Sequence, residues 1–132
     1  MGVVLLHFLL NAPPYTSRSF DDTYVGLGTG TACHSASTGW VTAWYRLTGT
    51  YPKLQQQGAY VINIGGTVSP GFMQFSHPST TGQTISGIVG FNYSGSVTNW
   101  TSSIQVTNCG SYFVYYLPPN PTTCTIAYVS GF

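Results

Sequence analysis

The amino-acid sequence predicts an all-β protein, a small single-domain β-sandwich of short, mainly antiparallel strands with loops rich in glycine and proline. Three observations predict this fold class. Short segments rich in β-branched and aromatic residues recur along the chain. No longer window shows helical periodicity, and glutamate is absent. Sixteen glycines and eight prolines separate the segments, and 132 residues are enough for one compact domain.

The first expected element is the apolar run 3–10, which only His7 interrupts. It is much shorter than the roughly 20 residues that cross a membrane as a helix, so we expect no membrane span. A buried β-strand is the favoured interpretation, because the turn-forming residues 11–14 follow the run directly. A signal-peptide remnant is the alternative, although no basic residue precedes the run.

Further strands are expected in the rest of the chain. In order, they cover residues 40–48, 59–64, 72–76, 85–91, 103–107, 111–117 and 124–129. Turn residues fill the gaps between them, a spacing typical of a sandwich or a small barrel. We find no linker and no internal repeat, which favours a single domain.

Ionic groups are almost missing from the sequence. Charged residues make up 4% of the chain, where about 25% is usual for a soluble domain. They are Arg18, Asp21, Asp22, Arg46 and Lys53. Nucleic-acid binding needs clustered basic residues, so we expect no nucleic-acid partner. Because little charge repulsion keeps copies of this chain apart, we expect its surface to associate readily.

Candidate catalytic and metal-binding residues are few. Asp21 and Asp22 are adjacent, so a strand would point their carboxylates to opposite faces. Cys33 and His34 are also neighbours, but adjacency does not pair a nucleophile with its base, and His34 is expected to be an exposed turn residue. The three cysteines and three histidines lack the spacing of a zinc site. We therefore expect no enzymatic activity, cofactor or metal ion.

Asn92 and Asn99 each begin an N-glycosylation sequon, Asn-Tyr-Ser and Asn-Trp-Thr. Such sites are used only in a secretory pathway. The cysteines are three in number, so at least one has no partner within the chain. Together these features favour a secreted protein.

Several motifs resemble, in order and spacing, the eight-cysteine domain family of uromodulin and the pancreatic zymogen-granule glycoprotein. The resemblance covers about residues 31–129 and rests on WYRLTG at 44–49, MQFSHPS at 73–79 and the segment 87–128. The motif residues are Trp44, Tyr45, Arg46, His77, Pro78, Trp100, Tyr112, Tyr115 and Tyr128. The resemblance implies an extracellular domain that carries glycans and acts as an adhesion target or a scaffold arm.

Other residues occupy five of the eight family cysteine positions, since the chain has only three cysteines. In the family pattern, the cysteine before the WYR motif pairs with the one after the proline, which implies a Cys33–Cys124 disulfide here. The family partner of Cys109 would lie near the chain start, where this sequence has no cysteine. Cys109 is therefore expected to be free and buried, or bonded to another subunit. An enlarged apolar core or oligomeric packing would compensate for the lost disulfides.

Two motif residues are given structural roles in this interpretation. His77 and Pro78 are expected to form a turn with a buried, hydrogen-bonded imidazole. Arg46 is expected to donate to backbone carbonyls or to one of the aspartates. Neither role needs a ligand.

The expected organisation has two parts. Residues 1–30 form an apolar strand and loop, which packs on its own domain or exchanges into a neighbouring subunit, and residues 31–132 form the uromodulin-type eight-cysteine-like β-domain. The first functional hypothesis is a secreted, non-enzymatic structural protein that assembles with its own copies into an extracellular fibre or matrix. The alternative is a glycan-bearing adhesion or recognition module, with glycans or other extracellular proteins as partners.

Overall fold

The computed structural model describes residues 13–19 and 24–131, so the apolar run 3–10 lies outside the described residues. The described chain is all-β, as predicted, and contains no α-helix. Its one helical element is a 3₁₀ turn, η2 (Ala36–Thr38), which Ser35 caps by accepting a hydrogen bond from the backbone N–H of Ser37.

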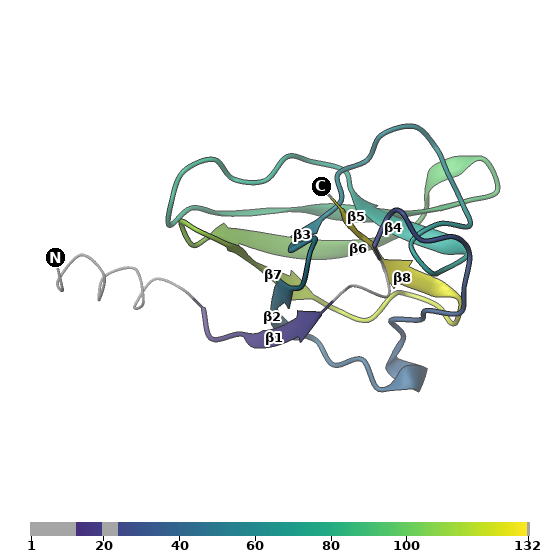
Figure 1. Cartoon of the computed structure of the whole chain (residues 1–132), viewed down its shortest axis with the longest axis horizontal. Coiled ribbons are helices and arrows are strands. Elements are labelled where there is room, and N and C mark those ends of the chain that lie inside the picture. Colours follow the sequence, from purple (N-terminus) through teal and green to yellow (C-terminus); the bar gives the residue numbers. More distant parts are fainter. Residues whose placement is uncertain (1–12, 20–23, 132) are drawn as a thin grey trace, which may run out of the picture.

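Within the described residues the strands form two sheets (Figure 1). In the order of their pairing, the strands of the large sheet are β1 (Thr16–Ser19), β2 (Ala43–Thr48), β7 (Phe113–Leu117), β6 (Ser96–Asn108), β5 (Thr84–Tyr93), β4 (Ser69–Met73) and β8 (Ile126–Tyr128). The small sheet pairs β3 (Lys53–Leu54) with β9 (Ser130–Gly131). The β1–β2 and β4–β8 pairs are parallel, and the other strand pairs of the described chain are antiparallel.

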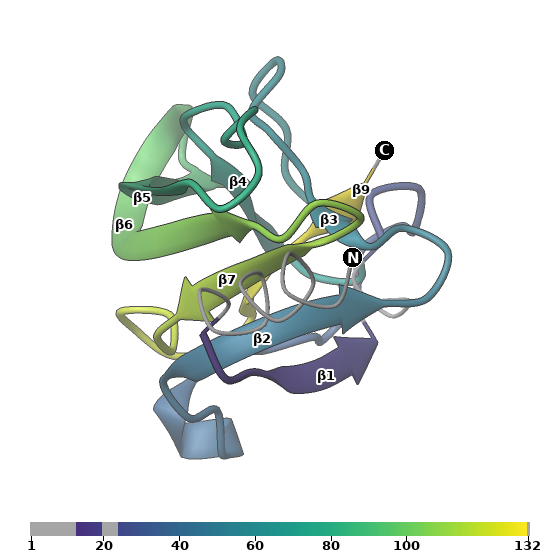
Figure 2. The same ribbon diagram turned by 90° about the vertical axis from the view of Figure 1, so that its left-hand side faces the viewer.

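The expected sandwich is corrected to a half-barrel. Figure 2 shows the strands of the large sheet arranged as an open curl, with β3 and β9 beside its open side. The segment after β3 ties this side together, because Gln55 donates its backbone N–H to Val129 and accepts one from Met73, both at 2.9 Å. This one segment therefore links β4 to the C-terminal residues, and a two-stranded sheet covers the core where a second full sheet was expected.

A tight turn joins the two longest strands, β5 and β6. Its central residues, Ser94 and Gly95, have φ values of 51° and 81°, as a type I′ hairpin turn requires. This hairpin extends both strands beyond the predicted segments 85–91 and 103–107. The added residues are largely polar, so the apolar pattern alone did not reveal them.

The strand predicted at 59–64 is wrong. These residues form an irregular loop in which Tyr60 is exposed and Asn63 has a φ of 60°. Conversely, β1, β3 and β9 were not predicted. β1 has the polar sequence Thr-Ser-Arg-Ser, and the other two are only two residues long, so neither case offers a hydrophobic period to detect.

The core lies on the inner face of the curled sheet. Its buried side chains are Trp40, Tyr45, Leu47, Leu54, Met73, Val89, Phe91, Ile104, Val106, Tyr115, Leu117, Ile126 and Tyr128. The hydroxyl of Tyr115 accepts the backbone N–H of Leu54 at 3.2 Å, and that of Tyr128 donates to the carbonyl of Pro118. Burial raises the pKa of both tyrosines, so both stay neutral at physiological pH.

Replacing Tyr115 by phenylalanine should lower the free energy of unfolding by about 1–3 kcal/mol, because the N–H of Leu54 and Nε2 of His77 both lose their partner. Tyr116→Phe is the matched control. That side chain is half-buried, and its hydroxyl makes no hydrogen bond within the described chain, so a change below about 0.5 kcal/mol is expected. Denaturant unfolding measures both variants, and equal losses would contradict the assignment.

Candidate functional site

A disulfide joins two distant parts of the chain. Cys33 and Cys124 are 91 residues apart in sequence, and their Cα atoms lie 5.1 Å apart. Next to this bond, His34 donates its backbone N–H to Ile126 at 3.0 Å, and its Nδ1 accepts the N–H of Tyr128 at 3.0 Å. Two hydrogen bonds therefore fasten the loop before η2 to β8, and the disulfide fastens it to the segment just before β8.

The prediction that His34 is an exposed turn residue is wrong. The residue is 2% exposed, and its ring packs on Trp40 with centroids 4.3 Å apart. Its carbonyl accepts the N–H of Asn120 at 2.7 Å. The hydrogen-bonding partners of His34, which are Asn120, Ile126 and Tyr128, lie far away in sequence, so no local pattern could have indicated its burial.

Cys109 is a free thiol at the end of β6, and it is half-buried. Burial raises the pKa of this thiol, although Tyr112 and Arg46 act in the opposite direction. Cys109 is therefore a protonated thiol at neutral pH, which is the less reactive form.

The two sequons differ in their exposure. Asn92 is fully buried, and its side-chain amide pairs with that of Gln57, donating at 2.9 Å and accepting at 3.1 Å. Its Nδ2 also donates to the carbonyl of Val97 at 3.1 Å. The folded chain has no room for a glycan on this nitrogen, which corrects the expectation for Asn92. Asn99, in contrast, is exposed on β6.

The imidazole of His77 has a hydrogen-bonding partner at each nitrogen. Nδ1 lies 2.7 Å from Oε1 of Gln56, and Nε2 lies 2.8 Å from the hydroxyl of Tyr115. Desolvation, followed by the charge of Lys53, lowers the pKa of His77 to about 4. The side chain is half-buried, and the neighbouring Pro78 is buried. This imidazole is therefore neutral at pH 7 and connects the loop after β4 to β7.

A cleft with two cations lies where the β6–β7 turn faces the connection between β2 and β3. Its volume is about 320 Å³, and its lining residues are Arg46, Leu47, Pro52, Lys53, Gly110, Ser111, Tyr112 and Phe113. We call it the Arg46–Lys53 cleft. The guanidinium of Arg46 lies 3.8 Å from the centroid of the Tyr112 ring and donates to the Tyr15 hydroxyl at 3.4 Å. The partners expected for Arg46, a backbone carbonyl or an aspartate, are not found among the described residues.

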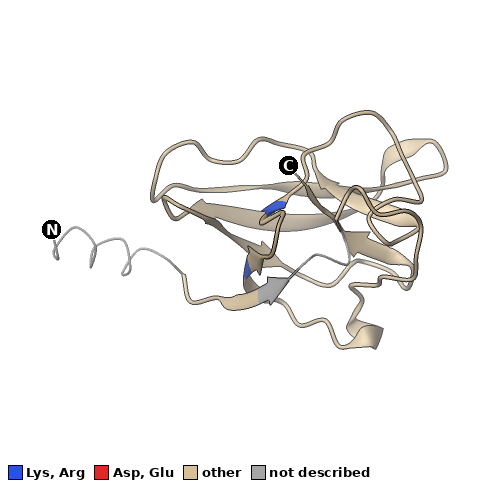
Figure 3. Ribbon diagram, viewed as in Figure 1, with Lys and Arg blue, Asp and Glu red and all other residues tan. Residues whose placement is uncertain are grey.

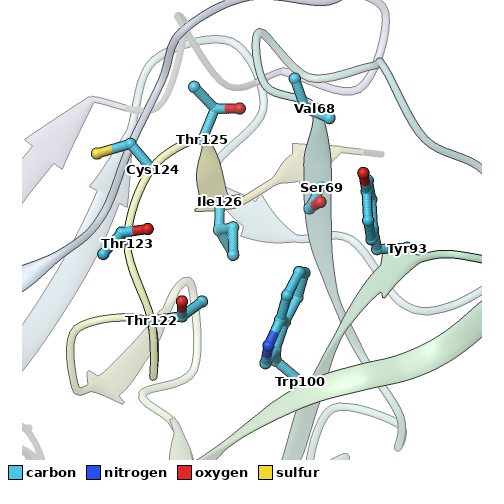
Figure 4. A pocket seen from close by; sticks show the side chains of 9 residues that line it. All are labelled: Val68, Ser69, Tyr93, Trp100, Thr122, Thr123, Cys124, Thr125 and Ile126. Carbon is cyan, nitrogen blue, oxygen red and sulfur yellow. The ribbon is translucent and has the colours of Figure 1, made fainter.

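An uncharged cavity of about 230 Å³ opens beside β4, β8 and the end of the β5–β6 hairpin (Figure 4). The rings of Tyr93 and Trp100 form one wall, with centroids 5.6 Å apart and planes inclined by 27°. The cavity is also lined by residues with hydroxyl groups, which are Ser69, Thr122, Thr123 and Thr125. We call it the Trp100 cavity.

The outer face of the large sheet carries a shallow hollow of about 420 Å³ over β5, β6 and β7. Its lining residues are Ser86, Gly87, Ile88, Ser103, Ile104, Gln105 and Tyr116. The ring of Tyr116 packs on Trp44 of β2, with centroids 5.5 Å apart. None of these described residues is charged. We call this surface the outer hollow.

Among residues 13–19 and 24–131, no group of three His, Cys, Asp or Glu residues could hold a metal ion. No helix of the described chain is long and apolar enough to cross a membrane. Asp21 and Asp22 lie outside the described residues.

The curled sheet and its single disulfide define a small disulfide-bonded all-β domain. The chain belongs to the family of uromodulin-like eight-cysteine domains, whose model matches residues 45–130, and this confirms the resemblance seen in the motifs. It is similar to uromodulin of Mus musculus, 28% identical over 102 residues, and of Rattus norvegicus, 30% identical over 102 residues. Each match covers 76% of this chain but 15% of the relative, so the chain spans a small part of the curated relatives.

The motifs indicated some of the residues at these sites and missed their neighbours. Arg46 and Tyr112 were singled out, but Lys53, which lines the same cleft, was not. Trp100 was singled out, but Tyr93, which stacks against it, was not. The sequence offered one signal for Lys53, which is that it is one of only three basic residues in the chain.

Replacing Cys33 and Cys124 together by serine should lower the free energy of unfolding by about 4–5 kcal/mol, from the chain entropy of a loop of this length. Cys109→Ser is the control and should change the free energy of unfolding by less than about 1 kcal/mol, because serine has nearly the same size and the contact of the thiol with the Thr107 carbonyl, at 4.0 Å, is weak. Thermal unfolding without reductant measures both variants. A Cys109 variant as unstable as the double variant would contradict this assignment.

His77 should make the stability depend on pH. Its pKa is about 4 in the folded chain against 6.5 as the usual value, so the unfolded chain takes up the proton first as the pH falls. The contribution of the neutral His77 to the free energy of unfolding is full above about pH 6.5 and is lost as the pH falls towards 4. Because solvent screens this half-buried group, we expect the loss to be about 1 kcal/mol. His77→Gln does not titrate and should flatten the dependence in this range. Denaturant unfolding at several pH values tests this, and an unchanged slope counts against it.

Proposed function

We propose that this protein is an extracellular, non-enzymatic structural domain whose copies associate through the outer hollow. The observation that carries the proposal is the absence of charge from the described residues of this surface, in a chain with only 4% charged residues. Ile88 is 38% exposed there, and Trp44 and Tyr116 extend the apolar area. A second copy of the chain fits this surface best, because contact between two such faces meets no charge repulsion and desolvates no ion.

The extracellular location is supported by the family and by the disulfide. Disulfides persist in oxidising compartments, and a domain of this size gains much of its stability from them. Asn99, exposed on β6, is the sequon that could carry a glycan in the folded chain.

The two-part organisation adds a further contact to the proposal. β1 is an edge strand, so one side of its backbone has no strand partner within the described residues. Residues 1–30 include both β1 and the apolar run 3–10, and residues 31–132 form the eight-cysteine-like domain. The apolar run of one copy can add to the β1 edge of another copy, as an exchanged strand.

A recognition module is the second candidate function, and the Trp100 cavity favours it. An aromatic wall beside several hydroxyl groups suits a neutral sugar, which offers an apolar ring face and many hydrogen-bonding groups. The cavity lies apart from the residues of the outer hollow, so the two functions can be separated by experiment.

Purified native protein should be larger than its 14.2 kDa monomer when concentrated, by size-exclusion chromatography and analytical ultracentrifugation, with fibres or sheets visible by electron microscopy. Ile88→Lys should shift it towards monomer, since copies would then meet with like charges. Val41→Lys is the matched control. It places the same charge on an apolar side chain that is 66% exposed and outside the hollow, so association should persist.

A monodisperse monomer at high concentration would contradict self-association. Binding of a neutral sugar by such a monomer, lost in Trp100→Ala, would instead favour the recognition module. Non-reducing electrophoresis of the native protein and of Cys109→Ser shows whether Cys109 joins two copies.

A further inference from the structure

The Arg46–Lys53 cleft has no part in the proposed association, and its charge is unusual for this molecule. Arg46 and Lys53 are the cations whose side chains the structure describes, and both line this cleft. Arg46 lies on β2 and Lys53 on β3, and Figure 3 shows no acidic position in the described ribbon. In a chain with three basic residues, their meeting in one cleft gives it a local positive charge.

Among the described residues, the titratable groups around the cleft leave this charge uncompensated. Hydrogen bonding to Tyr15, followed by burial, raises the pKa of Tyr112 to about 12, so that this hydroxyl is neutral. The thiol of Cys109 has a raised pKa and is also neutral. His77, whose pKa is lowered to about 4, adds no positive charge of its own. Tyr15 differs from its neighbours, because the hydrogen bond from Arg46 lowers its pKa.

Aromatic rings hold both cations in place. The guanidinium of Arg46 stacks on Tyr112, and Nζ of Lys53 lies 5.6 Å from the centroid of the Phe113 ring. Stacking fixes a guanidinium without using its N–H groups, and only Nη1 of Arg46 donates to a described partner, the Tyr15 hydroxyl. The remaining N–H groups of Arg46 and the ammonium of Lys53 are thus available to an anion.

The rest of the cleft suits the apolar body of a small molecule. Pro52 and Phe113 contribute apolar wall, and Ser111 contributes an exposed hydroxyl. A volume of about 320 Å³ is near the lower limit of small-molecule sites, and it suits a ligand with a single ring.

We propose that the Arg46–Lys53 cleft binds a small organic carboxylate that carries one ring. The carboxylate lies between Arg46 and Lys53, and the ring lies against Pro52 and Phe113. A uronic acid and an aromatic acid share this chemistry. The site goes beyond the proposed function, because its lining residues are not those of the outer hollow. Binding is weak and salt-dependent, since Lys53 is exposed to solvent.

Titration of the full ¹⁵N-labelled chain, followed by NMR at low salt, tests the proposal. Sodium glucuronate and sodium phenylacetate are the probes, with glucose and 2-phenylethanol as uncharged controls. The acids should produce saturable shifts at residues 46, 53 and 110–113, while the controls should not. Preference for glucuronate identifies a uronic acid as the ligand class, and preference for phenylacetate identifies an aromatic acid.

Arg46→Gln and Lys53→Gln should each weaken binding of the preferred acid about tenfold, the usual effect of losing one charged hydrogen bond. Lys53→Arg should retain binding, and Val41→Gln, outside the cleft, should leave the affinity unchanged. Because the Lys53 side chain is exposed, its replacement should not disturb folding. The Lys53 variants therefore test the proposal even if Arg46→Gln does not fold.

Three results would overturn the proposal. The first is equal shifts with the uncharged controls, and the second is unchanged affinity in Lys53→Gln. The third concerns the only acidic residues of the chain, Asp21 and Asp22. If the double variant Asp21→Asn/Asp22→Asn binds the acids and the natural chain does not, the carboxylates of the chain itself fill the cleft.

Discussion

The attachment of the loop before η2 to β8 is the constraint on which the curl of the sheet depends. β8 is an edge strand, and its only strand partner in the described chain is β4, which runs parallel to it. The Cys33–Cys124 disulfide and the hydrogen bonds of His34 hold that edge, and the backbone hydrogen bond from Gln55 to Val129 holds the residue just after it. Because the core lies inside the curl, these few contacts keep its aromatic side chains covered.

Neutral hydrogen bonds replace the ion pairs that a more charged domain would use. The hydroxyls of Tyr115 and Tyr128, the imidazole of His34 and the amide of Asn92 all satisfy buried partners without a fixed charge. Among the described residues, Gln55 Oε1 is the buried side-chain atom without a partner. A core of this kind avoids the desolvation cost of buried ions.

The surface separates two kinds of chemistry. The outer hollow and the Trp100 cavity offer aromatic, hydroxyl and amide groups, whereas both described cations line a single cleft. The proposed apolar association and the proposed recognition of an anion therefore use different residues. A charge introduced at Ile88 acts on the first without touching the second, since Ile88 does not line the cleft.

By itself the sequence determined the fold class, the family and the non-helical character of the chain, because aromatic and β-branched patterns and spaced motifs are local properties. It also singled out Arg46, Trp100 and Tyr112, which proved to line cavities. Only the tertiary structure decided that the sheet curls, that Asn92 is buried and that Lys53 joins Arg46. Each of these depends on which distant strands lie side by side. The polar strand β1, for example, pairs with β2 through backbone hydrogen bonds, and such pairing leaves no hydrophobic period in its sequence.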